Sequence, residues 1–127
     1  MAGTSDYLEA AVLDAVLRNT SYTSPTTVFV ALFTSDPTDA GTGTECSGTG
    51  YARQSAAFSR TAGVAQNTSA IEFPTAGGSW STISHIGVMD AVSSGNLLYH
   101  AALSSSKAIT TGDIFRIPAG DLTVTMT

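Results

Sequence analysis

Charged side chains are scarce in this sequence of 127 residues. They make up 12% of it, whereas an ordinary soluble domain has roughly 25%. Five residues are basic against ten acidic ones, Lys107 is the one lysine, and the net charge is −5. Because binding to a phosphate backbone needs several converging cations, this composition disfavours a nucleic-acid-binding function.

Other features that the sequence lacks narrow the class of protein further. The single cysteine, Cys46, cannot form a disulfide within the chain, and no histidine stands beside it to favour a nucleophile. No run reaches the ~18 apolar residues of a membrane span. The first residues lack the basic and apolar regions of a secretory signal. We therefore expect a chain without an internal disulfide, a leader peptide or a membrane partner.

Small and hydroxyl-bearing residues take the place of charge. The 18 alanines, 19 threonines, 16 serines and 12 glycines together make up about half of the chain. Such a composition suits tightly paired β-structure and subunit interfaces. The length is enough for one domain and too short for two, so residues 1–127 are predicted to form a single domain.

Residues 5–18 carry the only helical pattern. Leu8, Val12 and Val16 recur at helical spacing on one apolar face. Leu13 and Leu17 widen this face beyond what one sheet needs to cover. We therefore expect the helix to pack on its own β-structure and also to contact a neighbouring subunit, which makes Leu13 and Leu17 interface candidates.

From residue 26 onward the pattern changes to short β-strands. Residues 27–33 form a continuous apolar run, which predicts a strand buried on both faces. Residues 80–89 and 97–103 flank a turn at 93–96 and are expected to pair as a hairpin. Closely spaced turns predict a mainly β fold, a β-sandwich of jelly-roll or immunoglobulin-like type over residues 26–127, with one N-terminal α-helix. Further strands are expected at residues 51–58, 70–73, 107–110, 114–117 and 122–126.

A long stretch rich in aspartate, threonine and glycine covers residues 34–50. Loops of this length are usually functional or mobile. Because the stretch lacks large apolar side chains, we expect it on the surface, where partners bind. Asp36 and Asp39 are therefore interface candidates. Deletion of residues 40–49 is expected to preserve the fold and to weaken attachment to a partner.

The two histidines, His85 and His100, are the first candidates for a chemical site. They would lie near one another if the hairpin pairs symmetrically. A metal site needs three or four ligands, and Asp90 is the nearest other donor in the sequence. Half-buried histidines that are hydrogen-bonded at an interface are the favoured interpretation.

Other chemical motifs are incomplete as well. Asp36, Asp39 and Glu45 could hold calcium, but their spacing differs from that of an EF-hand, and a turn stabilised by aspartate side chains is favoured. The sequence contains neither a nucleophile elbow nor a phosphate-binding glycine loop. We therefore predict no catalytic, cofactor-binding or metal-binding residues.

Arg53, Arg60 and Arg116 are rare charges in a chain that has so few of them. Arg53 is expected to face outward from the strand at 51–58, and Arg116 points away from its neighbours Phe115 and Ile117. Arginine is the usual cation for planar pairing with carboxylates at interfaces, so Arg53 and Arg116 are interface candidates. A solvated outer face is the alternative for both.

Several segments in order resemble one protein family. They are residues 7–9 (YLE), 13–14 (LD), 17–18 (LR), 22–34 (YTSPTTVFVALFT), 36–45 (DPTDAGTGTE), 50–54 (GYARQ), 71–74 (IEFP), Trp80, 85–87 (HIG), 95–100 (GNLLYH) and 117–122 (IPAGDL). Across nearly its whole length the chain resembles short structural proteins of tailed phages that are often labelled phage tail fibre protein. This resemblance implies a virion component without catalytic residues.

On this basis we expect a non-enzymatic bacteriophage structural protein, made in the cytoplasm of the host bacterium and built into the virion. Capsid decoration (a cement protein) or the base of a head fibre is the first interpretation, because the chain has no shaft repeat or coiled-coil pattern. The expected partners are further copies of itself, with a trimer favoured, and the major capsid protein or tail and fibre proteins.

Two alternatives remain open. One is a tail-fibre or tail-tip component that contacts the host surface. The other is a small carbohydrate-binding β module, which would need exposed aromatic rings beside polar groups. Trp80, Tyr51 and Tyr99 are the candidates for such rings, although packing in the core or at an interface is favoured for each.

Overall fold

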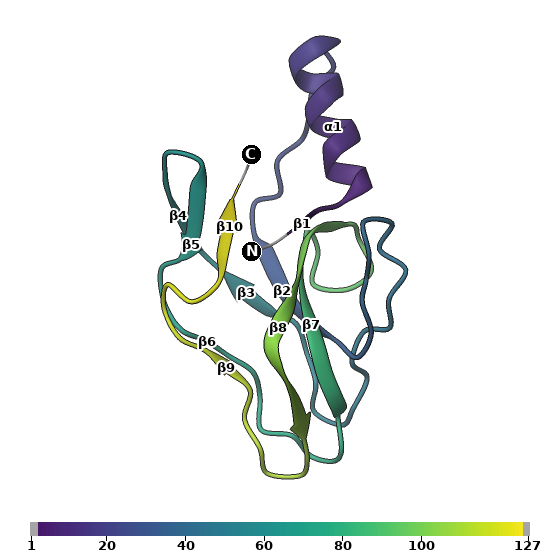
Figure 1. Ribbon diagram of the computed structural model, residues 1–127, viewed down its shortest axis with the longest axis vertical. Coiled ribbons are helices and arrows are strands. Elements are labelled where there is room, and N and C mark those ends of the chain that lie inside the picture. The colour runs from purple at the N-terminus through teal and green to yellow at the C-terminus, as the bar shows by residue number, and fades with distance from the viewer. Residues whose placement is uncertain (1–2, 126–127) are drawn as a thin grey trace.

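The computed structural model describes residues 3–125, which form one helix and ten strands (Figure 1). In chain order the elements are β1 (Gly3–Thr4), α1 (Asp6–Leu17), β2 (Val28–Phe33), β3 (Gln54–Ala56), β4 (Phe58–Thr61), β5 (Val64–Asn67), β6 (Ile71–Glu72), β7 (Ser81–Met89), β8 (Leu97–Ile109), β9 (Arg116–Ile117) and β10 (Thr123–Thr125).

The largest sheet is antiparallel and has the strand order β1-β8-β7-β2-β3. Its centre is the hairpin of β7 and β8, in which Gly87 pairs with His100. β2 pairs with the other edge of β7, where Leu32 lies opposite Ile86. The predicted hairpin and the predicted strand at 27–33 are both confirmed.

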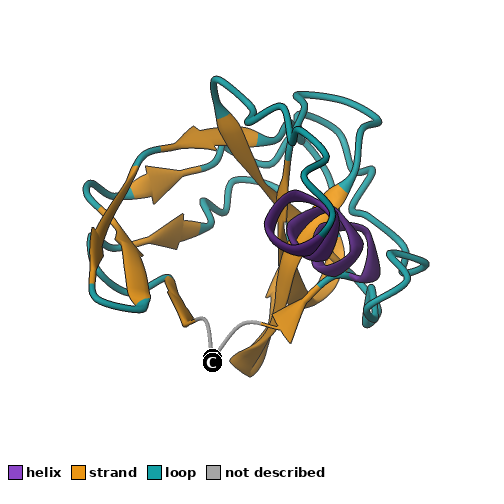
Figure 2. Ribbon diagram, turned by 90° about the horizontal axis from the view of Figure 1, so that it is seen from above, coloured by secondary structure: helices purple, strands orange, loops and turns teal. Residues whose placement is uncertain are grey.

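Two smaller sheets complete the β-structure, with the orders β10-β5-β4 and β6-β9. Seen from above, the strands of the three-stranded sheet face those of the five-stranded sheet across the interior (Figure 2). The arrangement is sandwich-like, and the predicted mainly β fold with one N-terminal helix is confirmed.

β2 is buried on both faces, as its apolar run predicts. Val30 and Leu32 belong to the main hydrophobic core. Ala31 and Phe33 point to the other side of the sheet, where they form a second small cluster with Met89 and Leu97. The five-stranded sheet is therefore covered on both faces along this strand.

Aromatic side chains fill the main core. Trp80 and Phe73 are each 2% exposed. Tyr51 stacks on Phe73 with the ring centroids 6.2 Å apart and meets Trp80 edge-on at 5.5 Å. The indole N–H of Trp80 donates to the carbonyl oxygen of Thr49 at 2.8 Å, so the polar atom of this buried ring is satisfied.

Several strands differ from the expectations. The sequence predicts no strand at β1 or β5, and the one strand predicted at residues 51–58 is wrong, because this segment contributes to two strands, β3 and β4, of different sheets. The sequence does not predict β5 because this segment is short and most of its residues have little strand propensity. β5 is a strand because it pairs with both β4 and β10. The separate strand expected at residues 107–110 is wrong, because β8 continues to Ile109. A shift of register between Ile83 and His85 keeps β8 paired with β7 along this length.

Residues 34–50 are only partly a surface loop. The amide N–H of Cys46 donates to the carbonyl oxygen of Leu32 at 2.8 Å, and the Cys46 side chain is buried in the core. A methyl group on Gly48 would collide with the ring of Trp80. The structure therefore contradicts the expectation that residues 40–49 can be deleted with the fold preserved, because part of this segment packs on the core.

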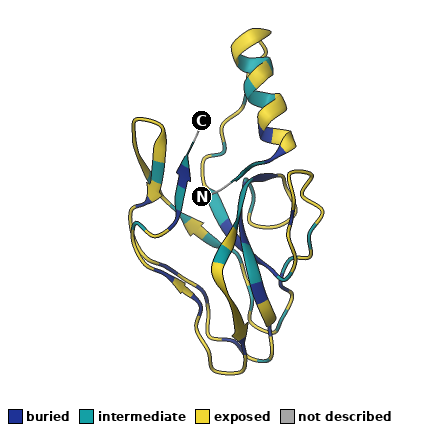
Figure 3. Ribbon diagram, in the orientation of Figure 1, coloured by how far each residue is buried: buried dark blue, intermediate teal, exposed yellow. Residues whose placement is uncertain are grey.

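α1 projects from one end of the β-structure (Figure 1). Leu8 is its only buried residue, and most of the helix is exposed (Figure 3). The apolar face predicted for residues 5–18 exists, but the chain itself covers only the beginning of it. No helix within residues 3–125 has the length and apolar character needed to cross a membrane.

Candidate assembly surfaces

The first turn of α1 is fixed to the five-stranded sheet. Ser5 is the N-cap: its Oγ accepts the N–H of Leu8 at 3.2 Å and donates to the carbonyl oxygen of Leu97 at 2.5 Å. The N–H of Asp6 donates to the carbonyl oxygen of Asp39 at 2.8 Å. These bonds hold the beginning of the helix, so its direction relative to the sheet is set.

The far half of α1 carries an uncovered apolar surface. Leu13, Val16 and Leu17 are 56%, 72% and 74% exposed. Their spacing of three and four residues places them on one side of the helix. We call these three residues the outer face of α1. The interface candidates Leu13 and Leu17 thus lie together, and no other part of the described chain buries them.

A second uncovered apolar surface is an open cleft of about 560 Å³ between the five-stranded and the three-stranded sheet. We call it the interlayer cleft. None of the residues that line it is charged. Its apolar walls include Val28, Ala56 and Phe58, which are partly exposed, and Val88, Leu98 and Val124, which are only 4–6% exposed.

The two histidines meet the loop aspartates beside the hairpin. His100 Nε2 lies 2.7 Å from Oδ1 of Asp39, which makes this nitrogen the donor to the carboxylate. Asp36 Oδ1 lies 3.9 Å from His85 Nε2 and 4.0 Å from His100 Nδ1. The interface candidate Asp39 is therefore hydrogen-bonded to His100, and Asp36 lies close to both histidines, whose side chains are mostly buried.

These groups do not make a metal centre. Asp36 Oδ1 also accepts the N–H of Thr38 at 2.8 Å, as in the aspartate-stabilised turn that the sequence predicts. Glu45 points away toward Arg53, so the three acidic residues of this loop do not converge. Within residues 3–125, no three histidine, cysteine or acidic side chains are placed to hold a metal ion.

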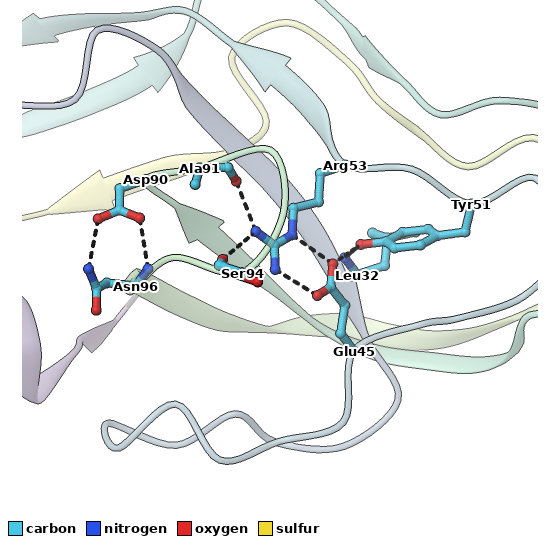
Figure 4. A network of polar contacts seen from close by, with 8 residues as sticks. All are labelled: Leu32, Glu45, Tyr51, Arg53, Asp90, Ala91, Ser94 and Asn96. Atoms are coloured by element: carbon cyan, nitrogen blue, oxygen red, sulfur yellow. Dashed lines mark hydrogen bonds and ion pairs between the residues drawn. The ribbon is translucent and has the colours of Figure 1, made fainter.

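Glu45 joins Tyr51 and Arg53 in a compact polar network (Figure 4). Arg53 donates from Nε and Nη2 to the two carboxylate oxygens of Glu45 at 2.9 and 2.8 Å. Its Nη1 donates to the carbonyl oxygens of Ala91 and Ser94, each at 2.8 Å. Arg53 thereby links the loop at 34–50 to the turn between β7 and β8.

Tyr51 completes this network from the core side. Its hydroxyl donates to Glu45 Oε2 at 2.6 Å and accepts the N–H of Leu32 at 3.0 Å. Burial raises the pKa of Tyr51, and the bond to Glu45 raises it further. Burial would also raise the pKa of Glu45, but the hydrogen bonds from Arg53 and Tyr51 outweigh it and hold that pKa below its usual range. Glu45 is therefore ionised at neutral pH.

The two arginine candidates have different surroundings. The expectation that Arg53 faces outward is wrong, because its side chain is 7% exposed and pairs with Glu45 of the same chain. Arg116 is exposed and lies 3.7 Å from Glu72 on the neighbouring strand, as a solvated outer face predicts. An inter-subunit contact of Arg116 stays a prediction.

Sequence reasoning missed both the interlayer cleft and the role of Glu45. A local signal for Arg53 does exist: Tyr51 and Arg53 are two residues apart in the strand predicted at 51–58, and side chains at this spacing in a strand point the same way. A core position for Tyr51 therefore implies an inward Arg53. The cleft has no such local signal, because its walls come from segments up to a hundred residues apart.

The aromatic candidates for carbohydrate binding are mostly withdrawn from the surface. Trp80 is buried, and Tyr51 packs between Phe73 and Trp80 with its hydroxyl bonded to Glu45. Packing in the core, the favoured expectation for both, is confirmed. Tyr99 lines the interlayer cleft and is half-buried.

A family model described as "Podophage GP4 fiber I protein gp80" matches residues 3–125, which is the whole described length of the chain. A search among curated proteins found no significant match.

Proposed function

Since the chain belongs to the podophage GP4 fiber I protein gp80 family, we propose that it is a structural subunit at the base of a phage fibre, where it joins the fibre to the particle. The role is assembly and not catalysis. In this proposal the chain is made in the host cytoplasm and then becomes part of the virion.

The shape of the chain supports a base in preference to a shaft. The strands are short, the sheets enclose one core, and α1 has 12 residues, which corresponds to about 18 Å of helix. A shaft needs a repeated or elongated element, such as a long coiled coil. This chain is instead a compact unit that has apolar surface left for partners.

The outer face of α1 is the observation that carries the proposal. Three large aliphatic side chains lie in solvent on a chain whose other large apolar groups mostly pack together. Uncovered apolar patches of this kind mark interaction sites. We propose that the outer face is buried between copies of the chain, with a trimer as the first choice, and that the assembled unit contacts the major capsid protein or other fibre proteins.

Size-exclusion chromatography with light scattering on the purified chain tests the association. The wild type is expected to run as an oligomer, and Leu13→Asp as a folded monomer, because burying an unpaired carboxylate costs several kcal/mol. The matched control is Ile114→Asp, which places the same charge at a similarly exposed position, 51% against 56%. Ile114 belongs to the connection between β8 and β9, and this connection lies at the end of the molecule opposite to α1 (Figure 1). A wild-type monomer, or equal loss of association in both variants, would contradict the proposal.

Capsid decoration is the second candidate function, and the compact form of the chain favours it as well. Particles assembled without the protein separate the two. Loss of the fibre and of adsorption to host cells, with unchanged resistance to heat and low salt, supports the fibre base. Loss of heat or low-salt resistance with adsorption unchanged supports decoration. A cryo-EM reconstruction of the particle gives the location directly.

A further inference from the structure

The outer face of α1 and the interlayer cleft are two uncovered apolar surfaces on the same chain. We propose that they cover one another between copies: α1 of one subunit docks in the interlayer cleft of a second copy. This inference rests on the proposed homo-oligomer and names the contact that builds it.

The two surfaces match in character. Leu13, Val16 and Leu17 are aliphatic and exposed, while the cleft is walled by aliphatic and aromatic side chains with no charge among them. Docking therefore removes apolar area of both surfaces from water and buries no unpaired charged group. The volume of about 560 Å³ lies within the range of pockets that enclose several side chains or a small ligand.

Charge favours docking of α1 in the cleft of another copy over packing of α1 against α1 of another copy. The helix carries Asp6, Glu9 and Asp14, and its one cation, Arg18, is already paired with Asp14 at 3.1 Å. Glu9 lies one turn before Leu13 on the same side of the helix. Helices packed around a common axis through this face would bring these carboxylates together, and twelve residues make less than two heptads of coiled coil.

Arg60 adjoins the residues of β4 and β5 that line the interlayer cleft, and we place this cation at the rim of the cleft. Arg60 pairs across β4 and β5 with Ala65, which lines the cleft, and it shares a strand face with Phe58, another cleft residue. Its Nη1 donates to the carbonyl oxygen of Ala62, and no carboxylate of residues 3–125 lies within ion-pair distance of it. An acidic helix in the cleft would supply that carboxylate, with Glu9 the first candidate.

Because the first turn of α1 is fixed to its own sheet, the outer face of α1 is available to another copy. Ser5 and Leu8 hold the first turn on the five-stranded sheet, and the helix then runs away from the body (Figure 1). Because the contact joins two different surfaces, it is heterologous, and a rotation that closes gives a ring. A ring of three matches the trimer proposed above.

Cross-linking between variants that each carry one added cysteine besides the native, buried Cys46 tests this contact. One chain carries Val16→Cys on the outer face of α1, and the other carries Ser55→Cys or Ala57→Cys, both exposed positions that line the cleft. The two proteins are mixed, exchanged and treated with a short bis-maleimide. We expect a covalent dimer in the mixture. The parent chain is the control, since Cys46 is 4% exposed and should not react.

The outcomes separate this inference from the proposed function. If the Val16→Cys chain cross-links with itself and not with the cleft variants, the oligomer stands but the helix packs on a helix, and the inference is wrong. No cross-link in an oligomeric mixture also overturns it. If light scattering shows that the wild type is a monomer, the proposed homo-oligomer fails, and the inference fails with it.

A charge exchange gives an independent measurement. Arg60→Glu is expected to weaken association about fivefold, because it replaces an attraction at the rim by a repulsion. Adding Glu9→Arg to the same chain should restore most of the loss. Lys107→Glu is the matched control, a basic residue that lies elsewhere on the surface and outside the interlayer cleft. Equal effects of Arg60→Glu and Lys107→Glu, or no rescue, would contradict the docking.

Discussion

Replacement of Glu45 by alanine should destabilise the fold far more than replacement of any exposed acidic residue. The carboxylate of Glu45 accepts hydrogen bonds from Nε and Nη2 of Arg53 and from the hydroxyl of Tyr51. In Glu45→Ala the guanidinium, which is 7% exposed, keeps its two carbonyl partners but loses its counter-charge. The variant therefore leaves a charge and a phenol in the interior without their acceptor.

The magnitude follows from burial and geometry. Breaking a fully buried ion pair costs about 3–5 kcal/mol. The side chain of Glu45 is 27% exposed, so water can replace part of what is lost, and we expect about 2–3 kcal/mol. At this chain length that corresponds to a fall in Tm of roughly 10 °C. In urea the midpoint should fall by about 1–2 M.

Glu72→Ala is the matched control for this measurement. Glu72 also faces an arginine, Arg116, but at 3.7 Å and with both side chains more than half exposed. Exposed pairs contribute about 0–1 kcal/mol, so this variant should unfold close to the wild type. Urea unfolding followed by tryptophan fluorescence suits the test, because Trp80 lies in the core beside Tyr51.

The pH dependence of the stability difference between wild type and Glu45→Ala tests whether the ionised Glu45 is its cause. The pKa of Glu45 is held below its usual range in the folded chain, so its ionised form stabilises the fold. This contribution is complete above the ordinary glutamate pKa of about 4.3 and is lost as the pH falls through the lowered value. The difference between wild type and Glu45→Ala should therefore shrink below pH 4. A difference under about 1 kcal/mol at pH 7, or one that does not change with acid, would refute the reasoning.

Two further substitutions probe other parts of the fold. Gly48→Ala should cost about 1–3 kcal/mol in urea unfolding, because the added methyl group meets the ring of Trp80 and the carbonyl oxygen of Ser79, whereas Gly78→Ala, with 3.5 Å to its nearest neighbour, should cost far less. Ser5→Ala should cost about 1–2 kcal/mol, since it removes the N-cap of α1 and its bond to Leu97; light scattering of the same variant should show weaker association, and unchanged association would mean that the root of α1 does not guide assembly.

The elements that the sequence predicts are those whose signal is local. The helix is predicted because its apolar residues recur at a period of 3.6. β2 is predicted because six consecutive apolar residues, 28–33, indicate a strand buried on both sides. The hairpin follows from two strands around a serine- and glycine-rich turn. Each of these patterns lies within about twenty-five residues, and the structure preserves each.

Arg53 shows why the remaining features are harder to predict. Its partners are Glu45 and the carbonyl oxygens of residues 38 and 41 positions further along the chain. A charged residue in a short strand is predicted to face solvent, because most charged residues are exposed. What turns it inward is a set of acceptors that only the folded chain brings together. β5 is likewise determined by distant partners, because its four residues form a strand only through backbone pairing with β4 and β10.

The placement of charge separates the stability of the fold from assembly. Arg18, Arg53 and Arg116 each face a carboxylate of their own chain, and of these only the Arg53 pair lies in the interior. Arg60 has no such partner within residues 3–125 and lies at the rim of the interlayer cleft. The outer face of α1 likewise contributes nothing to the core of its own chain. Substitutions at Leu13, Val16, Leu17 or Arg60 should therefore change association with little effect on unfolding, and substitutions at Glu45 or Arg53 should do the reverse.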